Sequence, residues 1–240
     1  DLLALTDTIF GIAATLLSEE EIVDSVQNWI MEDRSNFLVK TLEGSGSSVA
    51  EIAGAIERFH HLTPHGMEVQ PARAKALRVS LIRRLLNDDP NFIAIAKRYL
   101  EVDDFNELLH HIIFPAGSQG RLGGKGAGLF LAMNLVRKVM GKAPGVPILK
   151  SPKTWYLTSD GILNFINHND LEEIVERKYE DIAQIRREYP YVIHVFKNSA
   201  VPPEMVNGLS VALDDFGECP LIVRSSSLLE DRTGTSFAGK

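Results

Sequence analysis

The chain has 240 residues and a formal net charge of −7, with 45% hydrophobic and 24% charged residues. This is the composition of an ordinary globular protein, long enough for one large domain or two small ones. No apolar run approaches the roughly 20 residues of a membrane-spanning helix, so a membrane segment is not expected. Acidic residues outnumber basic ones in residues 1–115, which argues against nucleic-acid binding.

The chain begins at Asp1 without a basic segment before its first apolar residues, so no signal peptide is expected. Because Asp1 is not an initiator methionine, we expect a processed product or an excised piece. A single cysteine, Cys219, cannot form an internal disulfide and favours a reducing, cytoplasmic location. Cys219 precedes Pro220 with no histidine near it in sequence, so it is expected to be buried packing rather than a nucleophile.

Residues 1–115 are predicted to form an all-helical domain. Five apolar stripes with helical spacing indicate five helices. Their members are Ile22, Val26 and Ile30; Val49, Ile52, Ile56 and Phe59; Leu77, Leu81 and Leu85; Phe92, Ile95 and Tyr99; and Phe105, Leu108, Leu109 and Ile112.

Local signals place the ends of several of these helices. Ser18 with Glu21, and Ser48 with Glu51, have the spacing of capping boxes. The glycine- and serine-rich residues 44–48 predict a flexible loop. Pro71 suits the first turn of a helix, and the pair at 89–90, Asp-Pro, predicts a break.

Residues 115–120 predict a domain boundary, after which strands and helices alternate as in α/β proteins. The expected strands are 146–149, 154–158, 192–196 and 221–223. The expected helices cover 129–140, 158 or 159 to 165 with Thr158 or Ser159 as the cap, 171–189, and 202–216.

The first motif with chemical content is a glycine-rich run that leads into a helix: Leu122-Gly123-Gly124-Lys125-Gly126-Ala127-Gly128. Glycines let the backbone approach a ligand, a helix N-terminus offers N–H donors, and lysine adds a positive charge. These features suit a phosphate, although the spacing is not that of a Walker A loop. By itself the run is equally consistent with a flexible linker.

The second motif follows the expected strand at 221–223: Arg224-Ser225-Ser226-Ser227, then Glu230-Asp231 and Thr233-Gly234-Thr235-Ser236-Phe237-Ala238-Gly239-Lys240. Ligands of α/β folds bind beyond strand ends, and arginine can hold phosphate oxygens with two parallel hydrogen bonds. The alternative is a simple strand-to-turn transition in which Arg224 pairs with Glu230 or Asp231.

Together the two motifs, with the proline-rich residues 143–148 between them, resemble the N-terminal ATP-binding (PEP/pyruvate-binding) domain of the pyruvate, phosphate dikinase and phosphoenolpyruvate synthase family. The resemblance covers about residues 120–240. It implies an α+β or α/β protein: an all-helical domain at 1–115, then the first subdomain of an ATP-grasp-like fold at 116–240, truncated at its C-terminal end.

The resemblance also implies site residues and ligands, namely ATP with Mg²⁺. Lys125 and Arg224 would contact the phosphates of ATP, beside Gly124 and Gly126. A loop with Gly234, Thr235 and Ser236 would close over them. Glu230 and Asp231 would bind metal or position that loop.

The implied activity is that of a dikinase-like phosphotransferase, a kinase-type enzyme. It would phosphorylate a histidine on a downstream domain and pass the phosphate to pyruvate or another acceptor. Since the second ATP-grasp lobe and that histidine would lie downstream, residues 1–240 alone are expected to be inactive. A non-catalytic nucleotide-sensing or partner-binding module is the main alternative, and an antibiotic-directed phosphotransferase is a third.

Two further groups of residues receive structural interpretations. The histidines at 60, 61, 65, 110 and 111 lack partners at ligand spacing, so helix-face or core positions are favoured over a metal site. A basic helix with Arg73, Lys75, Arg78, Arg83 and Arg84 is expected to be a solvated face rather than to dock on acidic residues of its own domain or a partner.

Overall fold

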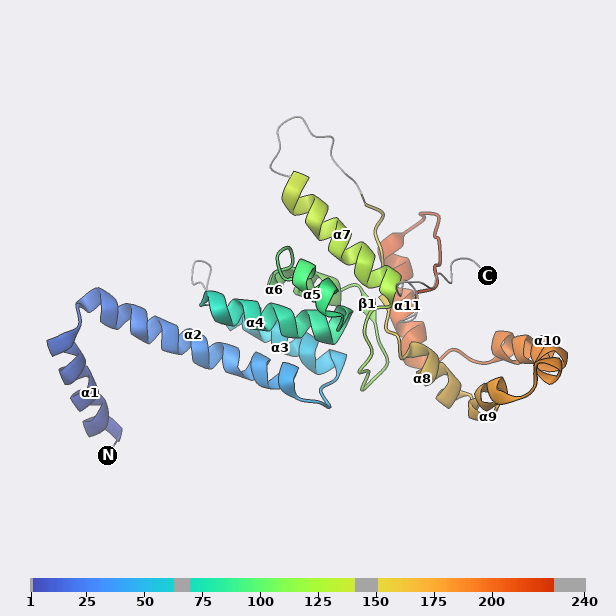
Figure 1. The fold of residues 1–240 in the computed structure, drawn as a ribbon, viewed down its shortest axis with the longest axis horizontal. Helices are drawn as coiled ribbons and strands as arrows, with labels where there is room; N and C mark the ends of the chain where they lie inside the picture. Colours follow the sequence, from blue (N-terminus) through green and yellow to red (C-terminus); the bar gives the residue numbers. More distant parts are fainter. Residues whose placement is uncertain (1, 63–69, 141–150, 227–240) are drawn as a thin grey trace.

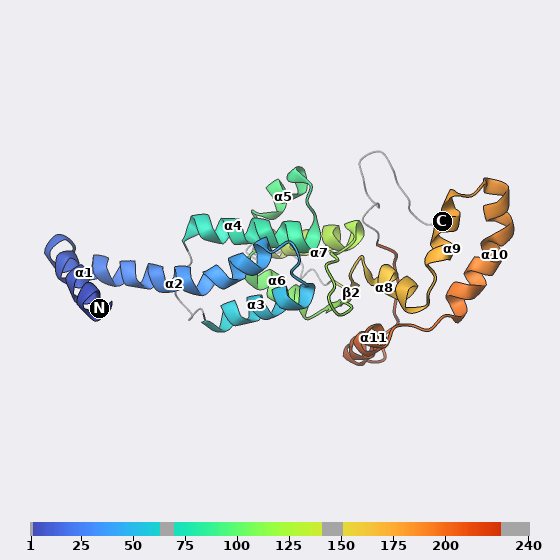
Figure 2. The ribbon, with the colours of Figure 1, turned by 90° about the horizontal axis from the view of Figure 1, so that it is seen from below.

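The computed structural model describes residues 2–62, 70–140 and 151–226, and helices make up most of this part of the chain (Figure 1). The molecule is elongated. Helices α1 and α2 extend from one end, a central group of helices follows, and α8 to α10 lie at the other end (Figure 2). The C-terminal α11 lies beside the small sheet that contains β1 (Figure 1).

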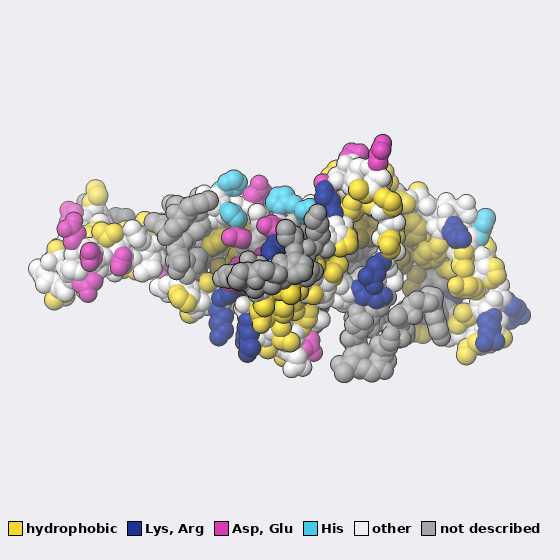
Figure 3. All heavy atoms as spheres, turned by 90° about the horizontal axis from the view of Figure 1, so that it is seen from above, with side chains coloured by type: hydrophobic (Ala, Val, Ile, Leu, Met, Phe, Trp, Pro, Cys, Tyr) yellow, Lys and Arg dark blue, Asp and Glu magenta, His cyan; other side chains and the backbone are white. Residues whose placement is uncertain are grey.

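The N-terminal end consists of α1 (Leu2–Leu16) and the long α2 (Glu19–Glu43). The apolar side chains of α1 are exposed, with Leu3 75% and Leu16 76% accessible, and they contribute to the surface at that end (Figure 3). Helix α1 is absent from the predicted elements, because its apolar residues surround the helix instead of forming one stripe. Helix α2 becomes buried towards its C-terminal end, where Leu38 is fully inaccessible.

The central group contains shorter helices that pack on α2 or on one another. These are α3 (Val49–Leu62), α4 (Pro71–Leu81), the π-helical turn η1 (Ile82–Leu86), α5 (Pro90–Ala96) and α6 (Val102–Leu109). Their predicted stripes supply about half of the buried core, including Ile52, Ile56, Leu77, Leu81, Leu85, Phe105 and Leu108.

The predicted start signals of these helices are confirmed. Ser18 and Glu21 exchange the two hydrogen bonds of a capping box, at 2.7 and 3.3 Å. Ser48 and Glu51 do the same at 2.7 and 3.2 Å. Pro71 is the first residue of α4, and Asp89 caps α5, which begins with Pro90. Each signal depends on neighbouring residues, so it can be recognised without the tertiary structure.

The core continues beyond residue 115 into α7 (Gly124–Met140). Leu122, Ala127, Phe130 and Leu131 belong to the same buried cluster as the central helices. The rings of Phe105 and Phe130 lie 6.0 Å apart. One apolar cluster therefore spans the predicted boundary at 115–120, and the division into domains at 1–115 and 116–240 stays a prediction.

Within the described residues the strands form a two-stranded parallel sheet of β1 (Ile112–Ile113) and β2 (Tyr156–Leu157). Ile112 is paired with Tyr156, and Ile113 with Leu157. The strand predicted over 154–158 is thus confirmed in its centre. The placement of Ile112 in a fifth helix is wrong, because α6 ends at Leu109 and the chain then pairs with β2.

Two elements predicted within residues 171–196 are wrong. The helix predicted over 171–189 is divided into α9 (Glu172–Glu176), the 3₁₀ turn η2 (Arg177–Tyr179) and α10 (Ile182–Asn198). Asp181 begins α10 anew by accepting a hydrogen bond from the N–H of Ala183 at 2.7 Å. The strand predicted over 192–196 lies inside α10, where Phe196 packs on Phe165, with ring centroids 5.7 Å apart.

The other predicted elements have mixed outcomes. Helix α11 (Pro203–Phe216) matches its prediction, and α8 (Gly161–His168) has Asp160 at its cap position instead of Thr158 or Ser159. Residues 221–223 form no strand, and Val223 is 97% exposed, since no strand in the described residues pairs with this segment. The strand expected at 146–149 lies outside the described residues. The ATP-grasp-like subdomain stays a prediction.

Candidate nucleotide site

The N-terminus of α7 carries the glycine-rich motif. Ala127 N donates to Gly123 O at 2.9 Å, so the helix starts directly after Gly123 and Lys125 lies in its first turn, half-buried. The first turn contains no acidic residue. The first N–H groups of a helix have no acceptor within it, and they carry a partial positive charge. This end of α7 therefore favours an oxygen acceptor or an anion.

The second motif reaches this helix end. The N–H of Gly126 donates to Oγ of Ser226 at 3.0 Å, across 100 residues of sequence. Gly123 lies against the backbone of Ser226 so closely that a Cβ at position 123 would collide with the Ser226 carbonyl group. A Cβ on Gly126 would lie 3.3 Å from the ring of Tyr156. The structure thus brings Ser226, at the start of the second motif, to the first motif, and glycine at 123 is required for this approach.

The predicted phosphate contacts are placed in part. Arg224 is exposed and precedes Ser226 by two residues, so it lies in the segment that reaches α7. Gly124 and Gly126 flank Lys125 in the first turn. The other predicted residues, Glu230, Asp231, Gly234, Thr235 and Ser236, lie outside the described residues.

A carboxylate missed by sequence reasoning holds the loop that precedes the motif. Asp160 Oδ1 accepts from Ser118 Oγ at 2.9 Å, and Oδ2 accepts from the N–H groups of Gln119 and Gly120 at 3.0 and 2.9 Å. Burial acts to raise the pKa of Asp160. Hydrogen bonds from Thr158, Ser118 and the loop amides outweigh that effect, so its pKa is lowered.

The residues predicted to cap α8 belong to the same contact. Ser159 N donates to Arg121 O at 2.9 Å, and Ser159 Oγ accepts from Arg121 N at 3.2 Å. The hydroxyls and the carboxylate at 158–160 bind the loop some 40 residues before them instead of capping their own helix. The polar residues at 158–160 therefore do form side-chain hydrogen bonds, but with the distant loop and not with the start of their own helix.

The basic helix is a solvated face only in part, because Lys75 and Arg83 are exposed whereas Arg73, Arg78 and Arg84 have partners in the chain. Arg73 pairs with Glu32 at 3.2 Å, Arg78 pairs with Glu101 at 2.9 Å, and Arg84 donates to a backbone carbonyl. The alternative of docking on acidic residues of its own domain is therefore correct for Arg73 and Arg78, whereas Arg84 binds backbone carbonyl groups. Cys219 is exposed, so the prediction of buried packing is also wrong.

His60 and His61 lie on α3 as expected, whereas His110 and His111 lie in the turn after α6 and not on a helix or in the core. His60 lies 3.2 Å from Asp103, and His111 packs edge-on against Trp155, with ring centroids 5.3 Å apart. Across residues 2–62, 70–140 and 151–226, no group of three or more His, Cys, Asp and Glu side chains could hold a metal ion.

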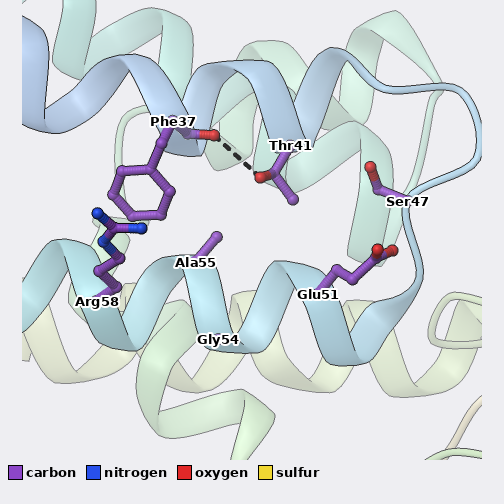
Figure 4. A pocket seen from close by; sticks show the side chains of 7 residues that line it. All are labelled: Phe37, Thr41, Ser47, Glu51, Gly54, Ala55 and Arg58. Carbon is purple, nitrogen blue, oxygen red and sulfur yellow. Dashed lines mark hydrogen bonds between the residues drawn. The ribbon is translucent and has the colours of Figure 1, made fainter.

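A shallow pocket of about 310 Å³ lies elsewhere, between α2 and α3 (Figure 4). It is open to solvent, and the guanidinium of Arg58 lies 4.6 Å above the ring of Phe37 at one end. None of the predicted phosphate contacts lines it. Its seven lining residues are Phe37, Thr41, Ser47, Glu51, Gly54, Ala55 and Arg58.

Lys125 lies in the first turn of a glycine-rich helix, and the hydroxyl of Ser226 accepts a hydrogen bond from the same turn. This arrangement suits an anionic ligand such as a phosphate. Residues 119–240 match the family model described as pyruvate phosphate dikinase, AMP/ATP-binding domain. This is just over half of the chain, and the chain belongs to this family. The family resemblance of the two motifs is thereby confirmed.

Other comparisons add no relative: no curated protein and no solved structure matches the chain. A helix able to cross a lipid bilayer does not occur within the described residues. The family match begins at residue 119, immediately before the loop held by Asp160, and includes both motifs. The helices before residue 119 lie outside the match.

Proposed function

We propose that the N-terminus of α7 binds the phosphates of ATP. Lys125 supplies the full positive charge, and the backbone N–H groups of Gly124 and Gly126 supply donors. Membership of an AMP/ATP-binding family supports the nucleotide. The observation that carries the proposal is the bond from the Gly126 N–H to Ser226 Oγ, because an oxygen acceptor already occupies this helix end.

Arg224 is the second cation of the proposed site. It is exposed, and it lies two residues from the hydroxyl that caps α7. Because Arg224 is only two residues from Ser226, its guanidinium can reach a phosphate bound at the N-terminus of α7. Gly234, Thr235 and Ser236 would close over the phosphates, which remains a prediction from the family resemblance.

The proposed reaction is a phosphoryl transfer of the dikinase type. ATP would donate a phosphoryl group to a histidine on a domain outside residues 1–240, and that histidine would pass the group to pyruvate or another acceptor. Cations and N–H donors favour such a transfer by neutralising charge on the phosphoryl oxygens. Glu230 and Asp231, the predicted metal or loop-positioning residues, lie outside the described residues.

The test has two stages. Calorimetric titration of residues 1–240 with ATP, at fixed Mg²⁺, should give saturable binding, and adenosine should bind more weakly because it lacks phosphates. The full-length protein incubated with labelled ATP should then gain an acid-labile phosphate, whereas residues 1–240 alone should not turn over. Binding without any phosphorylated species in the full-length protein would favour a nucleotide-sensing module. Absence of ATP binding would refute the proposed site.

A further inference from the structure

Arg84 holds the loop in front of α7 and is one of several groups on the helical side that contact it. Arg84 lies in η1, and its guanidinium donates through Nη1 to Gln119 O at 2.8 Å and through Nη2 to Ser47 O. The wide π-helical turn buries Ile82, Leu85 and Leu86 while Arg84 stays partly accessible. A planar guanidinium can hold two carbonyl groups in fixed directions, which an ammonium group does less well.

The same loop is held from the opposite side by Asp160. Its carboxylate accepts from Ser118 Oγ and from the backbone N–H groups of Gln119 and Gly120, at 2.9 to 3.0 Å. Gly120 lies so close to this carboxylate that a Cβ there would collide with it. The carboxylate therefore binds mainly the backbone of the loop.

Gln119 is the residue on which the two charges converge. Its N–H donates to Asp160, its carbonyl accepts from Arg84, and its side-chain Nε2 donates to Gly46 O at 3.1 Å. Arg84 lies in the helices before residue 119, and Asp160 lies in the part of the chain that matches the family model. Together they hold the peptide groups on both sides of Gln119. Hydrogen bonds to charged groups are the stronger kind, so this residue is tightly constrained.

The constraint extends to the start of α7. Leu122 N donates to Leu85 O at 2.9 Å, so the turn that carries Arg84 also fixes the backbone immediately before Gly123. Two residues later the chain enters the first turn with Lys125. A shift of the loop at Gln119 would move the N–H donors of that turn.

We infer that Arg84 is a positioning residue for the nucleotide site, so that the helices preceding the family match take part in ATP binding. This inference rests on the proposed function of the α7 N-terminus. Arg84 does not contact the ligand in this arrangement. Arg84 fixes the direction in which α7 points its N–H donors. Asp160 has the same role and binds the same loop.

The test compares Arg84→Gln with Arg83→Gln, which removes the same charge from the exposed neighbouring position in the same turn. The first measurement needs no ligand. Amide hydrogen exchange of residues 118–122 should accelerate about tenfold or more in Arg84→Gln, as expected on losing a charge-assisted hydrogen bond. It should remain at the wild-type rate in Arg83→Gln.

The second measurement is the dissociation constant for ATP and for adenosine. Arg84→Gln should weaken ATP binding about tenfold while leaving adenosine binding unchanged, because the misplaced donors face the phosphates. Arg84→Lys should recover part of the loss. A general structural defect would weaken both ligands together and lower the melting temperature, which would contradict a positioning role.

The two proposals fail in different ways. If the wild-type chain does not bind ATP, the proposed function falls and the inference falls with it. If the wild-type chain binds ATP but Arg84→Gln matches Arg83→Gln in both exchange and affinity, the site stands and the inference is overturned. Asp160→Asn provides a second variant, in which the same loop amides should exchange faster and ATP should bind more weakly.

Discussion

Gly126 and Ser226 are joined by a hydrogen bond of 3.0 Å from the backbone N–H of the first to the hydroxyl of the second. The hydroxyl serves as a cap for α7 that comes from the far end of the described chain. A phosphate oxygen bound at this helix end would require the same donor. Ser226 and the proposed ligand therefore compete for one N–H group.

Replacing Ser226 should reveal this competition. Ser226→Ala frees the Gly126 N–H, so ATP should bind more tightly by a factor of about two to ten, the value of one neutral hydrogen bond. Ser226→Thr keeps the hydroxyl and serves as the matched control. Titration of each variant with ATP gives the comparison. Weaker binding in Ser226→Ala would mean that the hydroxyl contacts the ligand and does not compete with it.

Lys125→Ala should weaken ATP binding by a factor of about ten to a hundred, since it removes a full charge from the phosphate site. The fold should persist, because the side chain is half-buried at the end of a helix and not in the apolar core. Lys75→Ala, on the exposed face of α4, removes the same charge elsewhere. Circular dichroism checks the fold, and unchanged ATP affinity in Lys125→Ala would remove Lys125 from the site.

Two glycines of the same motif should respond in opposite directions to alanine. Gly123→Ala places a methyl group against the backbone of Ser226, so the two segments must separate and the melting temperature should fall. A methyl group on Gly128 would meet no atom of the described residues within 4 Å. Gly128→Ala should stabilise α7 by about 0.5–1 kcal/mol. Equal effects of the two substitutions on melting temperature would contradict the close approach at Gly123.

The hydrogen bonds of Asp160 should make the free energy of unfolding depend on pH in the acid range. The pKa of Asp160 in the folded chain is lowered from its ordinary value of 3.8, so the unfolded chain binds the proton more readily. The stabilisation is present above the unfolded pKa and is lost as pH falls through the folded pKa. Urea unfolding gives the free energy of unfolding of the wild type and of Asp160→Asn. The difference between these two free energies should be constant near neutral pH and should shrink below about pH 4. A difference that grows on acidification would show the opposite sign of shift.

Sequence reasoning succeeds where a signal depends on near neighbours. The capping boxes at Ser18 and Ser48 and the proline at 71 are local, and the helices begin where they indicate. The family can also be predicted, because the two motifs contain enough specific residues. Both kinds of information are present in short stretches of the chain.

Sequence reasoning fails where a local structure or a residue's role depends on partners far away in the sequence. Residues 192–196 have the β-branched and aromatic composition of a strand, yet Asp181 starts a helix that continues through them. Asp160 binds a loop 40 to 42 residues away, and nothing in its own surroundings indicates that partner. The role of Arg84 depends likewise on Gln119, 35 residues further along the chain.

The parallel pairing of β1 with β2 has a practical consequence for dissecting the protein. The N–H of Tyr156 donates to His111 O at 2.9 Å and that of Thr158 donates to Ile113 O at 3.1 Å, yet both acceptors precede residue 119, where the family match begins. A gene fragment started at that residue would leave these amides without their acceptors and would expose the sheet edge of β2. Expression should therefore begin upstream of the sequence-defined border, at a position that retains residues 111–113 and the helices that support them.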